Sequence, residues 1–529
     1  MFIDPSSLTR RRFLRNASMA ASVSLLPGLL NAQLPAETEV APSAVQDIEI
    51  RADQEIGRIR PELHGHFLEH LGSCIYGGLW VGTNSRIENV RGIRADALRY
   101  LKELRVPVLR WPGGCFADDY HWRDGIGPVK DRPRRVNINW GDVIEDNSFG
   151  THEFMDLCQM IGAEPYLAGN VGSASPQEMR DWVEYCNFPS GSTLSDMRAR
   201  NGAKEPFRVK YWGVGNESWG CGGSMHPQYY GELYRRYSTF LHDMGRTELY
   251  LIASGPSGDD VRWTRGLLDT CSDHLPGGLS MHYYAGGPAE ATHFTSKQAT
   301  DQFRIFHRVE KAIQHQREVV NGYHHGDEVG LVLDEWGVWD QIPESDEKRR
   351  GKLWQQSTMR SAVAAGLGLN LFNRNADKLF MCNIAQLMNV LQSLLLTDGA
   401  DGKTTVRTTT YHAFMLFKDH RNNVALNATN QDRSLDAVSV SASRGSDRQL
   451  VVSLVNPSTA LSVSVHCKIA SYAGKSARGR ILHASDANAF NSFEQPDKLH
   501  PTSFAPTLQD GKLTVELPPL SIATIHIEA

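Results

Sequence analysis

Two glutamates of this sequence stand at the ends of short apolar runs. Glu217 ends the stretch 209–217, and Glu335 ends the stretch 330–335. A carboxylate at the end of a buried strand costs desolvation free energy unless a partner or a reaction uses it. Either glutamate taken alone is explained equally well as a salt-bridge partner. Two that face one cleft are typical of glycoside hydrolysis, in which one carboxyl protonates the leaving oxygen and the other attacks or stabilises the anomeric carbon.

Further polar side chains follow other apolar runs of the chain. They are Glu69, Arg110, Asn170, Asn216, His282, Asp334 and Gln386. In a barrel of parallel strands, catalytic groups gather at the carboxyl ends of the strands. We therefore expect these side chains to surround the two glutamates in one site.

Several tryptophans near these runs offer flat apolar faces on which a sugar could stack. For any one of them packing is the better explanation; they are Trp111, Trp122, Trp140, Trp219, Trp336 and Trp339. His64, His66 and His70 raise the question of a metal site, because His64 and His66 share one face of a strand. Hydrogen bonding or packing explains these histidines better, and we expect no metal site.

The elements that position these residues alternate between short and long patterns. Short apolar runs predict eight buried strands, at 63–69, 108–111, 165–170, 209–216, 249–254, 279–282, 330–335 and 380–385. Between them, amphipathic patterns predict helices at 94–104, 149–161, 176–187, 228–244, 302–321 and 355–366. This alternation predicts an α/β fold, a closed (β/α)8 TIM barrel over 59–415. A doubly wound open sheet is the alternative, but no G-x-G-x-x-G motif follows the first strand.

The remaining chain has the pattern of an all-β domain. Segments 435–442, 449–455, 461–469, 479–483 and 512–516 are rich in Val, Ser, Thr and Leu and are separated by turn residues. They predict a C-terminal β-sandwich over 416–529. A strand within 46–58 precedes the barrel and is expected to join the sandwich. Segments 189–205 and 285–299 are predicted insertions that reshape the cleft.

The first residues have the form of an export signal. Arg10, Arg11 and Arg12 precede Phe13 and Leu14, and an apolar run at 17–30 follows. A basic region before a short apolar region is typical of a secretory signal, and paired arginines indicate the Tat type. We expect residues 1–35 to be this signal, with cleavage near Ala32 and a periplasmic or secreted enzyme. A disordered basic arm is the alternative.

Charge and cysteine content narrow the class of protein further. The formal net charge of the 529 residues is −5, and the sequence has no basic stripe of the kind that binds nucleic acid. No run is long enough for a comfortable membrane span, so we expect no stable membrane anchor. The 8 cysteines are widely spaced, without a C-x-x-C pair. We expect all or most of them to be reduced, buried thiols rather than a disulfide framework.

Five motifs, spread along the chain, resemble one known family. They are 213–217 (Gly-Val-Gly-Asn-Glu), 64–78 (from His-Gly-His-Phe-Leu-Glu to Ile-Tyr-Gly-Gly), 109–128 (from Leu-Arg-Trp-Pro-Gly-Gly-Cys-Phe to Asp-Gly-Ile-Gly-Pro), 334–339 (Asp-Glu-Trp-Gly-Val-Trp) and 385–389 (Ala-Gln-Leu-Met-Asn). The first resembles the acid/base motif of the clan of barrel hydrolases with catalytic glutamates on strands four and seven. Together they resemble an α-L-arabinofuranosidase of glycoside hydrolase family 51, from about Asp47 to the C-terminus.

The resemblance implies roles for named residues. It implies a retaining double displacement without a cofactor, with Glu217 as acid/base and Glu335 as nucleophile. The positions that hold the furanose or orient the glutamates are Glu69, Arg110, Asn216, Tyr284 and Gln386, with His282 beside them as a strand-end residue. Trp140 and Trp339 resemble aromatic walls around the sugar. Cys115 stands where relatives carry Asn or Cys and contact a sugar hydroxyl, and the C-terminal domain resembles the family's jelly-roll-like domain.

The implied activity is the exo-acting release of terminal arabinofuranosyl residues. The expected substrates are arabinan, arabinoxylan or their oligosaccharides, and the resemblance also implies a homo-oligomer, a trimer or hexamer. Two alternatives remain open. One is another activity of the same clan, an endo-β-glucanase or a xylan-cleaving hydrolase. The other is a non-catalytic carbohydrate-binding protein, which predicts binding without turnover.

Overall fold

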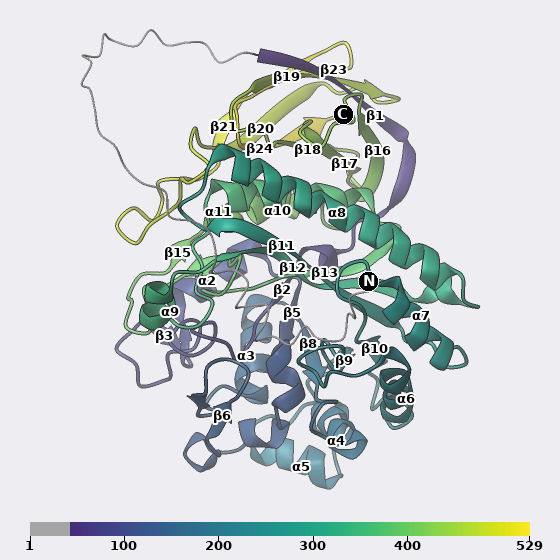
Figure 1. Ribbon diagram of the computed structural model, residues 1–529, viewed down its shortest axis with the longest axis vertical. Helices are drawn as coiled ribbons and strands as arrows, with labels where there is room; N and C mark the ends of the chain where they lie inside the picture. The colour runs from purple at the N-terminus through teal and green to yellow at the C-terminus, as the bar shows by residue number, and fades with distance from the viewer. Residues whose placement is uncertain (1–42) are drawn as a thin grey trace, which may run out of the picture. The chain divides into compact units, whose positions relative to one another are not determined.

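Parallel strands close a barrel at the centre of the molecule (Figure 1). The computed structural model describes residues 43–529, so the predicted signal at 1–35 lies outside the described residues. The barrel strands follow one another around the barrel in chain order: β2 (Gly65–Phe67), β5 (Val108–Trp111), β8 (Glu164–Gly169), β9 (Tyr211–Val214), β10 (Tyr250–Ala253), β11 (Gly278–Glu290), β12 (Gly330–Gln341) and β13 (Leu379–Ile384). Pairing of β13 with β2 closes the ring. The predicted (β/α)8 barrel is confirmed, and an open sheet is excluded.

Helices follow the strands around the outside of the barrel. They are α2 (Ala95–Leu104), α3 (Thr151–Ile161), α4 (Pro176–Asn187), α5 (Thr193–Arg200), α6 (Pro227–Ser238), α7 (Val261–Thr270), α8 (Ser296–Asn321), α9 (Glu344–Arg350), α10 (Met359–Arg374) and α11 (Thr409–Phe417). The helix predicted at 302–321 begins earlier, because the Thr295 side chain accepts a hydrogen bond from the Gln298 N–H and caps it. The sequence prediction missed α7, although Asp260 caps it in the same way by accepting from the Arg262 N–H.

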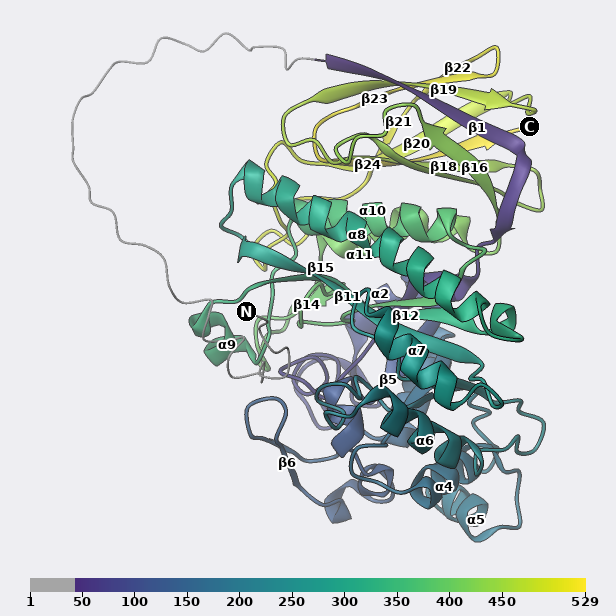
Figure 2. The same ribbon diagram turned by 45° about the vertical axis from the view of Figure 1, so that its right-hand side comes forward.

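Strands β11 and β12 extend well beyond the predicted ends at 282 and 335. They run side by side in parallel, with Tyr284 opposite Gly337 and Glu290 opposite Gln341. Figure 2 shows this long pair crossing the middle of the molecule. The prediction ended the first of these strands early because Gly286-Gly287 and the following Pro288 are typical of a loop. The segment expected as an insertion at 285–299 is therefore partly strand.

Short antiparallel strand pairs and 3₁₀ helices lie in the loops of the barrel. The pairs are β3 (Asn89–Val90) with β4 (Ile93–Arg94), β6 (Arg135–Asn137) with β7 (Val143–Glu145), and β14 (Leu395–Leu396) with β15 (Val406–Arg407). The 3₁₀ helix η3 (Cys115–Asp119) follows β5 directly after its carboxyl end. These elements shape the face of the barrel that carries the candidate site.

The C-terminal region forms one sheet that curls around its own core. Its order is β21 (Thr502–Phe504), β20 (Ser476–His483), β24 (Ser521–Glu528), β18 (Leu450–Asn456), β17 (Ser439–Arg444), β16 (Val424–Asn430), β1 (Ser43–Arg58), β19 (Ser462–Ala470), β23 (Lys512–Leu517) and β22 (Thr507–Gln509). Ile481 of β20 and Val515 of β23, from opposite ends of this order, belong to one apolar cluster. Strand β1 lies between β16 and β19.

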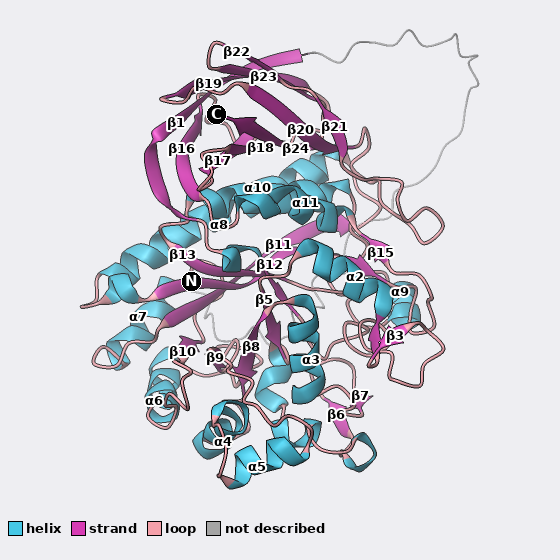
Figure 3. Cartoon of the chain, turned by 180° about the vertical axis from the view of Figure 1, so that it is seen from behind, coloured by secondary structure: helices cyan, strands magenta, loops and turns pink. Residues whose placement is uncertain are grey.

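Helix α10 joins this sheet to the barrel. The Asn370 side chain donates to the Ser439 carbonyl over 3.1 Å and accepts from the Ser441 hydroxyl over 2.7 Å. Arg374 donates to the Val440 carbonyl over 2.8 Å. In Figure 3, α8, α10 and α11 lie between the strands of the two regions. Within residues 43–529, no helix has the length and apolar character needed to cross a bilayer.

Candidate active site

Glu217 and Glu335 face each other at the carboxyl end of the barrel. Glu217 follows β9, Glu335 lies in β12, and a carboxylate oxygen of each lies within 4.8 Å of the other. Retaining glycosidases hold their carboxyl groups about 5–5.5 Å apart, whereas inverting enzymes need about 6.5–9.5 Å to admit a water. The Glu217 side chain is 19% exposed, and the Glu335 side chain is 8% exposed. The separation fits the retaining class.

Donors from two strands hold the Glu335 carboxylate. Arg110 Nη1 donates to Oε1 over 2.8 Å, and the Tyr284 hydroxyl donates to Oε2 over 2.7 Å. Burial acts to raise the pKa of Glu335, but the charges of His282 and Arg110 and these two hydrogen bonds outweigh it and hold that pKa below its ordinary value. An ionised carboxylate is the form that a nucleophile needs.

His282 lies between the two glutamates. Its Nδ1 is 2.9 Å from Glu217 Oε1 and 3.5 Å from Glu335 Oε2. Burial acts to lower the pKa of His282, but the two carboxylates overcome it and raise that pKa. The two carboxylates therefore make protonation of the imidazole easier, and Nδ1 lies within hydrogen-bonding distance of Glu217.

Arg110 connects three strands at the floor of the site. Besides Glu335, its guanidinium contacts Asp334 Oδ2 at 3.3 Å and donates to Asn216 Oδ1 over 2.5 Å. The loop after β5 passes close to this cluster, and a Cβ on Gly114 would lie 2.7 Å from Glu335 Oε1. Only glycine leaves room for the carboxylate at this position.

Asp118 anchors the backbone that carries Glu217, and the sequence analysis missed it. Its Oδ1 accepts from the N–H groups of Val171 and Gly172 over 2.7 and 2.8 Å, and Oδ2 accepts from the Asn216 N–H over 2.8 Å. Burial outweighs these three bonds and raises the pKa of Asp118 to about 7. Glu217 itself has φ +40°, a left-handed conformation that a side-chain-bearing residue adopts only when its surroundings enforce it. The prediction considered strand ends only, and Asp118 lies in η3 beyond the end of β5.

Glu69 forms a second polar cluster beside the glutamates. Its Oε1 accepts from the Trp140 indole over 3.0 Å and from the Phe116 N–H over 3.2 Å, while Oε2 accepts from Gln386 over 3.0 Å. Burial, with a smaller contribution from the charge of Glu335, raises the pKa of Glu69 to about 7. Among the described residues, Gln386 Oε1 and Asn216 Nδ2 are buried polar atoms with no hydrogen-bond partner. Such atoms are available to the hydroxyl groups of a ligand.

The tryptophans divide between core and site. Trp111, Trp122 and Trp336 are buried among other aromatic rings, so the packing explanation holds for them. Trp339 is half-buried, with its ring 5.3 Å from that of Tyr284 and nearly perpendicular to it. Trp219, two residues after Glu217, is also half-buried.

A disulfide links the loops after β5 and β9. The expectation of reduced thiols is correct for the other six cysteines of the described chain, but Cys115 and Cys221 are bonded. The two cysteines are 106 residues apart in the sequence. Their pairing has no local sequence signal, because the barrel brings the two loops together. Cys221 Sγ lies 3.4 Å from Glu217 Oε2. A disulfide sulfur carries no hydrogen, so Cys115 cannot donate to a sugar hydroxyl as a thiol would.

Other residues considered from the sequence have structural partners. The side-chain oxygen Oδ1 of Asn170 accepts from the N–H groups of Ser173 and Ala174 and shapes the loop after β8. His64 and His66 are buried beside Phe414. His70 is bonded to Glu145 and Trp111 instead of facing Glu217.

Known proteins resemble this chain over nearly its whole length. Residues 100–303 match the family model "Alpha-L-arabinofuranosidase 1 domain", and residues 334–521 match "Alpha-L-arabinofuranosidase C-terminal domain". The "Intracellular exo-alpha-L-arabinofuranosidase" of Bacteroides ovatus is 42% identical over 510 residues, which cover 94% of this chain and 98% of that protein.

Solved structures give the same result. The GH51 arabinofuranosidase from Xanthomonas axonopodis pv. citri superposes with a TM-score of 0.88 at 38% identity, covering 92% of this chain and 100% of that one. The α-L-arabinofuranosidase from Thermotoga maritima, solved as an arabinose complex, has a TM-score of 0.82 at 28% identity with the same coverage. Identity at this level over both chains confirms the resemblance found in the motifs. The chain belongs to the α-L-arabinofuranosidases of glycoside hydrolase family 51.

Proposed function

We propose that this protein is an exo-acting, retaining α-L-arabinofuranosidase that removes terminal arabinofuranosyl residues from arabinan, arabinoxylan or their oligosaccharides. The observation that carries the proposal is the pair of carboxylates, Glu217 and Glu335, with oxygens within 4.8 Å. The family supports the substrate class, and the name of the relative from Bacteroides ovatus supports exo action.

The first half of the reaction places the sugar on Glu335. Its carboxylate oxygen attacks the anomeric carbon, and the bond from that carbon to the leaving oxygen breaks. Glu217 gives its proton to that oxygen, so the leaving group departs as a neutral alcohol. Arg110 and Tyr284 keep Glu335 ionised until the ester forms.

The second half releases arabinose with its configuration retained. Glu217, now ionised, takes a proton from water as the water oxygen attacks the anomeric carbon. The ester bond to Glu335 breaks, and the carboxylate returns to its two donors. The unpartnered Asn216 Nδ2 and Gln386 Oε1 are suited to bind sugar hydroxyls in both steps.

A panel of aryl glycosides tests the activity. Aryl arabinofuranoside, xyloside and glucoside are assayed side by side, together with arabino-oligosaccharides whose products are separated. We expect turnover of the arabinofuranoside and release of arabinose alone. Internal cleavage products from glucan or xylan would favour an endo-acting hydrolase of the same clan, and binding without turnover would favour a carbohydrate-binding protein.

We also propose a location and an assembly state from the sequence and the resemblance. The arginines of segment 1–35 support Tat-type export, in contrast to the intracellular relative. The family resemblance supports a homo-oligomer, a trimer or hexamer. Light scattering on the purified protein measures that assembly state, and a monomer at working concentration would contradict it.

A further inference from the structure

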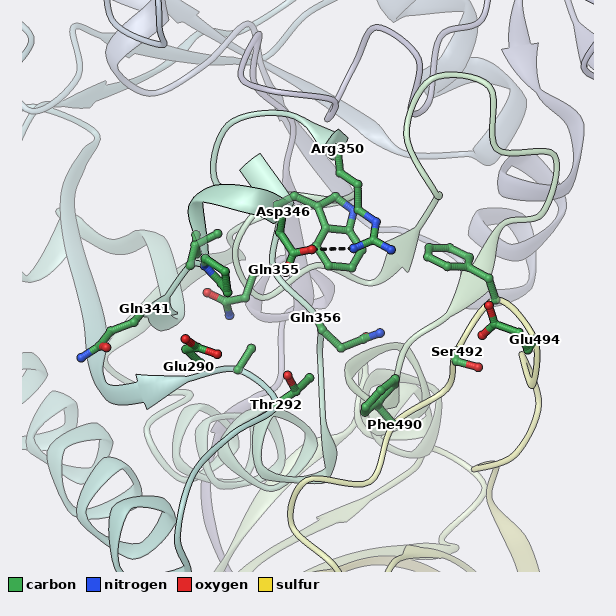
Figure 4. A pocket seen from close by; sticks show the side chains of 15 residues that line it. Glu290, Thr292, Gln341, Asp346, Arg350, Gln355, Gln356, Phe490, Ser492 and Glu494 are labelled. Carbon is green, nitrogen blue, oxygen red and sulfur yellow. Dashed lines mark hydrogen bonds and ion pairs between the residues drawn. The ribbon is translucent and has the colours of Figure 1, made fainter. Parts of the chain in front are cut away.

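A second cavity lies at the far ends of β11 and β12. Figure 4 shows Glu290 from β11, Gln341 from β12, and Asp346 and Arg350 from α9 around it, with Phe490 and Ser492 on the opposite side. Its volume of about 280 Å³ is close to the lower end of the about 300–1,000 Å³ that small-molecule sites occupy. No role found above uses this cavity.

We propose that this cavity is an outer subsite that binds a sugar unit of the polymer from which arabinose is released. The inference rests on the proposed function and adds to it a second point of contact with the substrate.

Two strands connect the cavity to the catalytic centre. β11 carries Tyr284 and ends at Glu290, while β12 carries Glu335 and ends at Gln341. At about 3.3 Å per residue, each strand covers at most about 20 Å between its catalytic residue and the cavity. Both strands leave the barrel at its carboxyl end, where the catalytic pair lies. A polysaccharide that places one residue between the glutamates has other residues within reach of this cavity.

The charge of the lining selects a neutral ligand. Glu290, Asp346 and Glu494 are acidic, and Arg350 is the one basic residue among the described residues of the lining. Arg350 is already paired with Asp346 over 2.7 Å and with Asp398 over 2.8 Å. This excess of negative charge disfavours phosphate and other anions. Hydroxyl groups of a neutral sugar can donate to the carboxylates.

The other side chains of the cavity lining, an amide and several aromatic rings, are of the kinds that bind sugars. The Gln356 amide reaches into the cavity in Figure 4. Its Oε1 accepts from the Ser357 N–H over 2.9 Å, while its Nε2 donates to the Asn491 carbonyl over 3.5 Å, a long hydrogen bond. Phe490 and Phe493 are half-buried and leave part of each ring uncovered. The Arg350 guanidinium lies over the Trp354 ring, 4.3 Å from its centre. The two planar groups both line the cavity. Apolar rings with a few placed polar groups are typical of sites for small organic ligands.

The loop that closes the cavity is held in place before any ligand binds. It lies between β20 and β21, and Asn491 anchors it by donating to the carbonyls of Arg407 and Leu499 over 2.9 Å each. Asn491 also accepts from the Leu499 N–H over 2.7 Å. A preformed loop spares the ligand the entropy of ordering it. The C-terminal region thereby supplies one wall of a substrate site.

The decisive experiment compares small and large substrates. The double variant Gln341→Ala/Phe493→Ala removes a polar and an aromatic group of the lining, and Ser492→Trp fills the cavity with a different change. We expect both to raise KM for branched arabinan and long arabino-oligosaccharides about tenfold or more. Their kcat and KM on 4-nitrophenyl arabinofuranoside, which is too short to reach the cavity, should stay at the wild-type values.

A matched control and a binding measurement complete the test. Gln431→Ala/Phe240→Ala makes the same changes at exposed positions away from the cavity and should alter neither substrate. In the Glu335→Gln background, calorimetry with arabinohexaose should show about tenfold weaker binding for the cavity variants and unchanged binding of arabinose.

The outcomes separate this inference from the proposed function. Wild-type enzyme without activity on the aryl arabinofuranoside would contradict the function itself. Normal aryl activity combined with wild-type KM for arabinan and wild-type hexaose affinity in both cavity variants would overturn the subsite alone. An equal loss on aryl and polymeric substrates would show a disturbed catalytic centre and would also overturn it.

Discussion

Asp118 accepts a hydrogen bond from the backbone N–H of Asn216 over 2.8 Å, at the residue directly before Glu217. The carboxylate thus bridges the loop after β5 and the loop that carries Glu217, while its other oxygen fixes the loop after β8. The position of Glu217 therefore depends on a residue whose carboxylate is bonded to backbone N–H groups.

Asp118→Asn tests this positioning role. An amide offers one acceptor oxygen in place of two, so one of the three N–H groups loses its partner. A lost hydrogen bond to a charged group costs about 1.5–3 kcal/mol, and we expect kcat to fall about 10- to 100-fold with a small change in KM. Steady-state kinetics measure this split. Asp119→Asn, the adjacent half-buried carboxyl, is the matched control, and an equal effect of both would argue against a specific role for Asp118.

Glu217→Ala and Glu335→Ala should differ by leaving group. General acid catalysis contributes about 10²–10⁴-fold, and nitrophenolate leaves without a proton while a sugar alkoxide does not. Glu217→Ala should therefore lose cleavage of arabino-oligosaccharides, keep glycosylation by aryl arabinofuranosides with a burst of nitrophenol, and turn over faster with azide. Glu335→Ala should be nearly inactive on both. If both variants lost activity equally on the two substrates, or if azide rescued neither variant, the assignment of the two roles would be wrong.

Tyr284→Phe should shift the acidic limb of the pH profile. The Tyr284 hydroxyl is one of the groups that hold the pKa of Glu335 below its ordinary value. A group with a lowered pKa in the folded protein is ionised above that pKa and loses its stabilising contacts as the pH falls through it. Removal of the donor raises the pKa, so the limb of kcat/KM should move to higher pH and the maximum should fall. An unmoved limb would mean that Tyr284 does not act through the ionisation of Glu335.

Loss of the Cys115–Cys221 disulfide should lower both the thermal stability and the catalytic rate. Closing a loop of the observed separation, 106 residues, contributes about 4–5 kcal/mol in the chain-entropy account. Cys115→Ser/Cys221→Ser and reductant should each lower the melting temperature and reduce kcat, because Cys221 contacts Glu217. Scanning calorimetry and activity with and without dithiothreitol measure this. Reductant should change neither the melting temperature nor the kcat of the double variant. An equal response of the wild type and the double variant to reductant would show that the effect does not come from this disulfide.

The export proposal has a separate test in cells. Replacing Arg10, Arg11 and Arg12 with Lys keeps the positive charge and removes the arginine pair. We expect folded, active enzyme to remain in the cytoplasm, measured by fractionation and arabinofuranosidase activity. Undiminished export of the Lys variant would contradict a Tat route.

The sequence alone determined the barrel and the chemistry of its strand ends. A buried strand needs a short apolar run between turn residues, and both signals are local, so each of the eight strands could be located. Parallel strands place their carboxyl ends together, which brings Glu217, Arg110 and Glu335 from distant parts of the chain into one site.

The tertiary structure alone decided the features that arise where loops meet. The Cys115–Cys221 bond, the bridge from Asp118 to Asn216 and the extension of β11 through Gly286 have no local signal. Each depends on a partner far away in the chain, and glycine-rich backbone accepts strand geometry only when a neighbouring strand supplies the hydrogen bonds. The cavity beyond β11 and β12 has the same origin, because its walls come from the barrel and from the sheet that packs behind it.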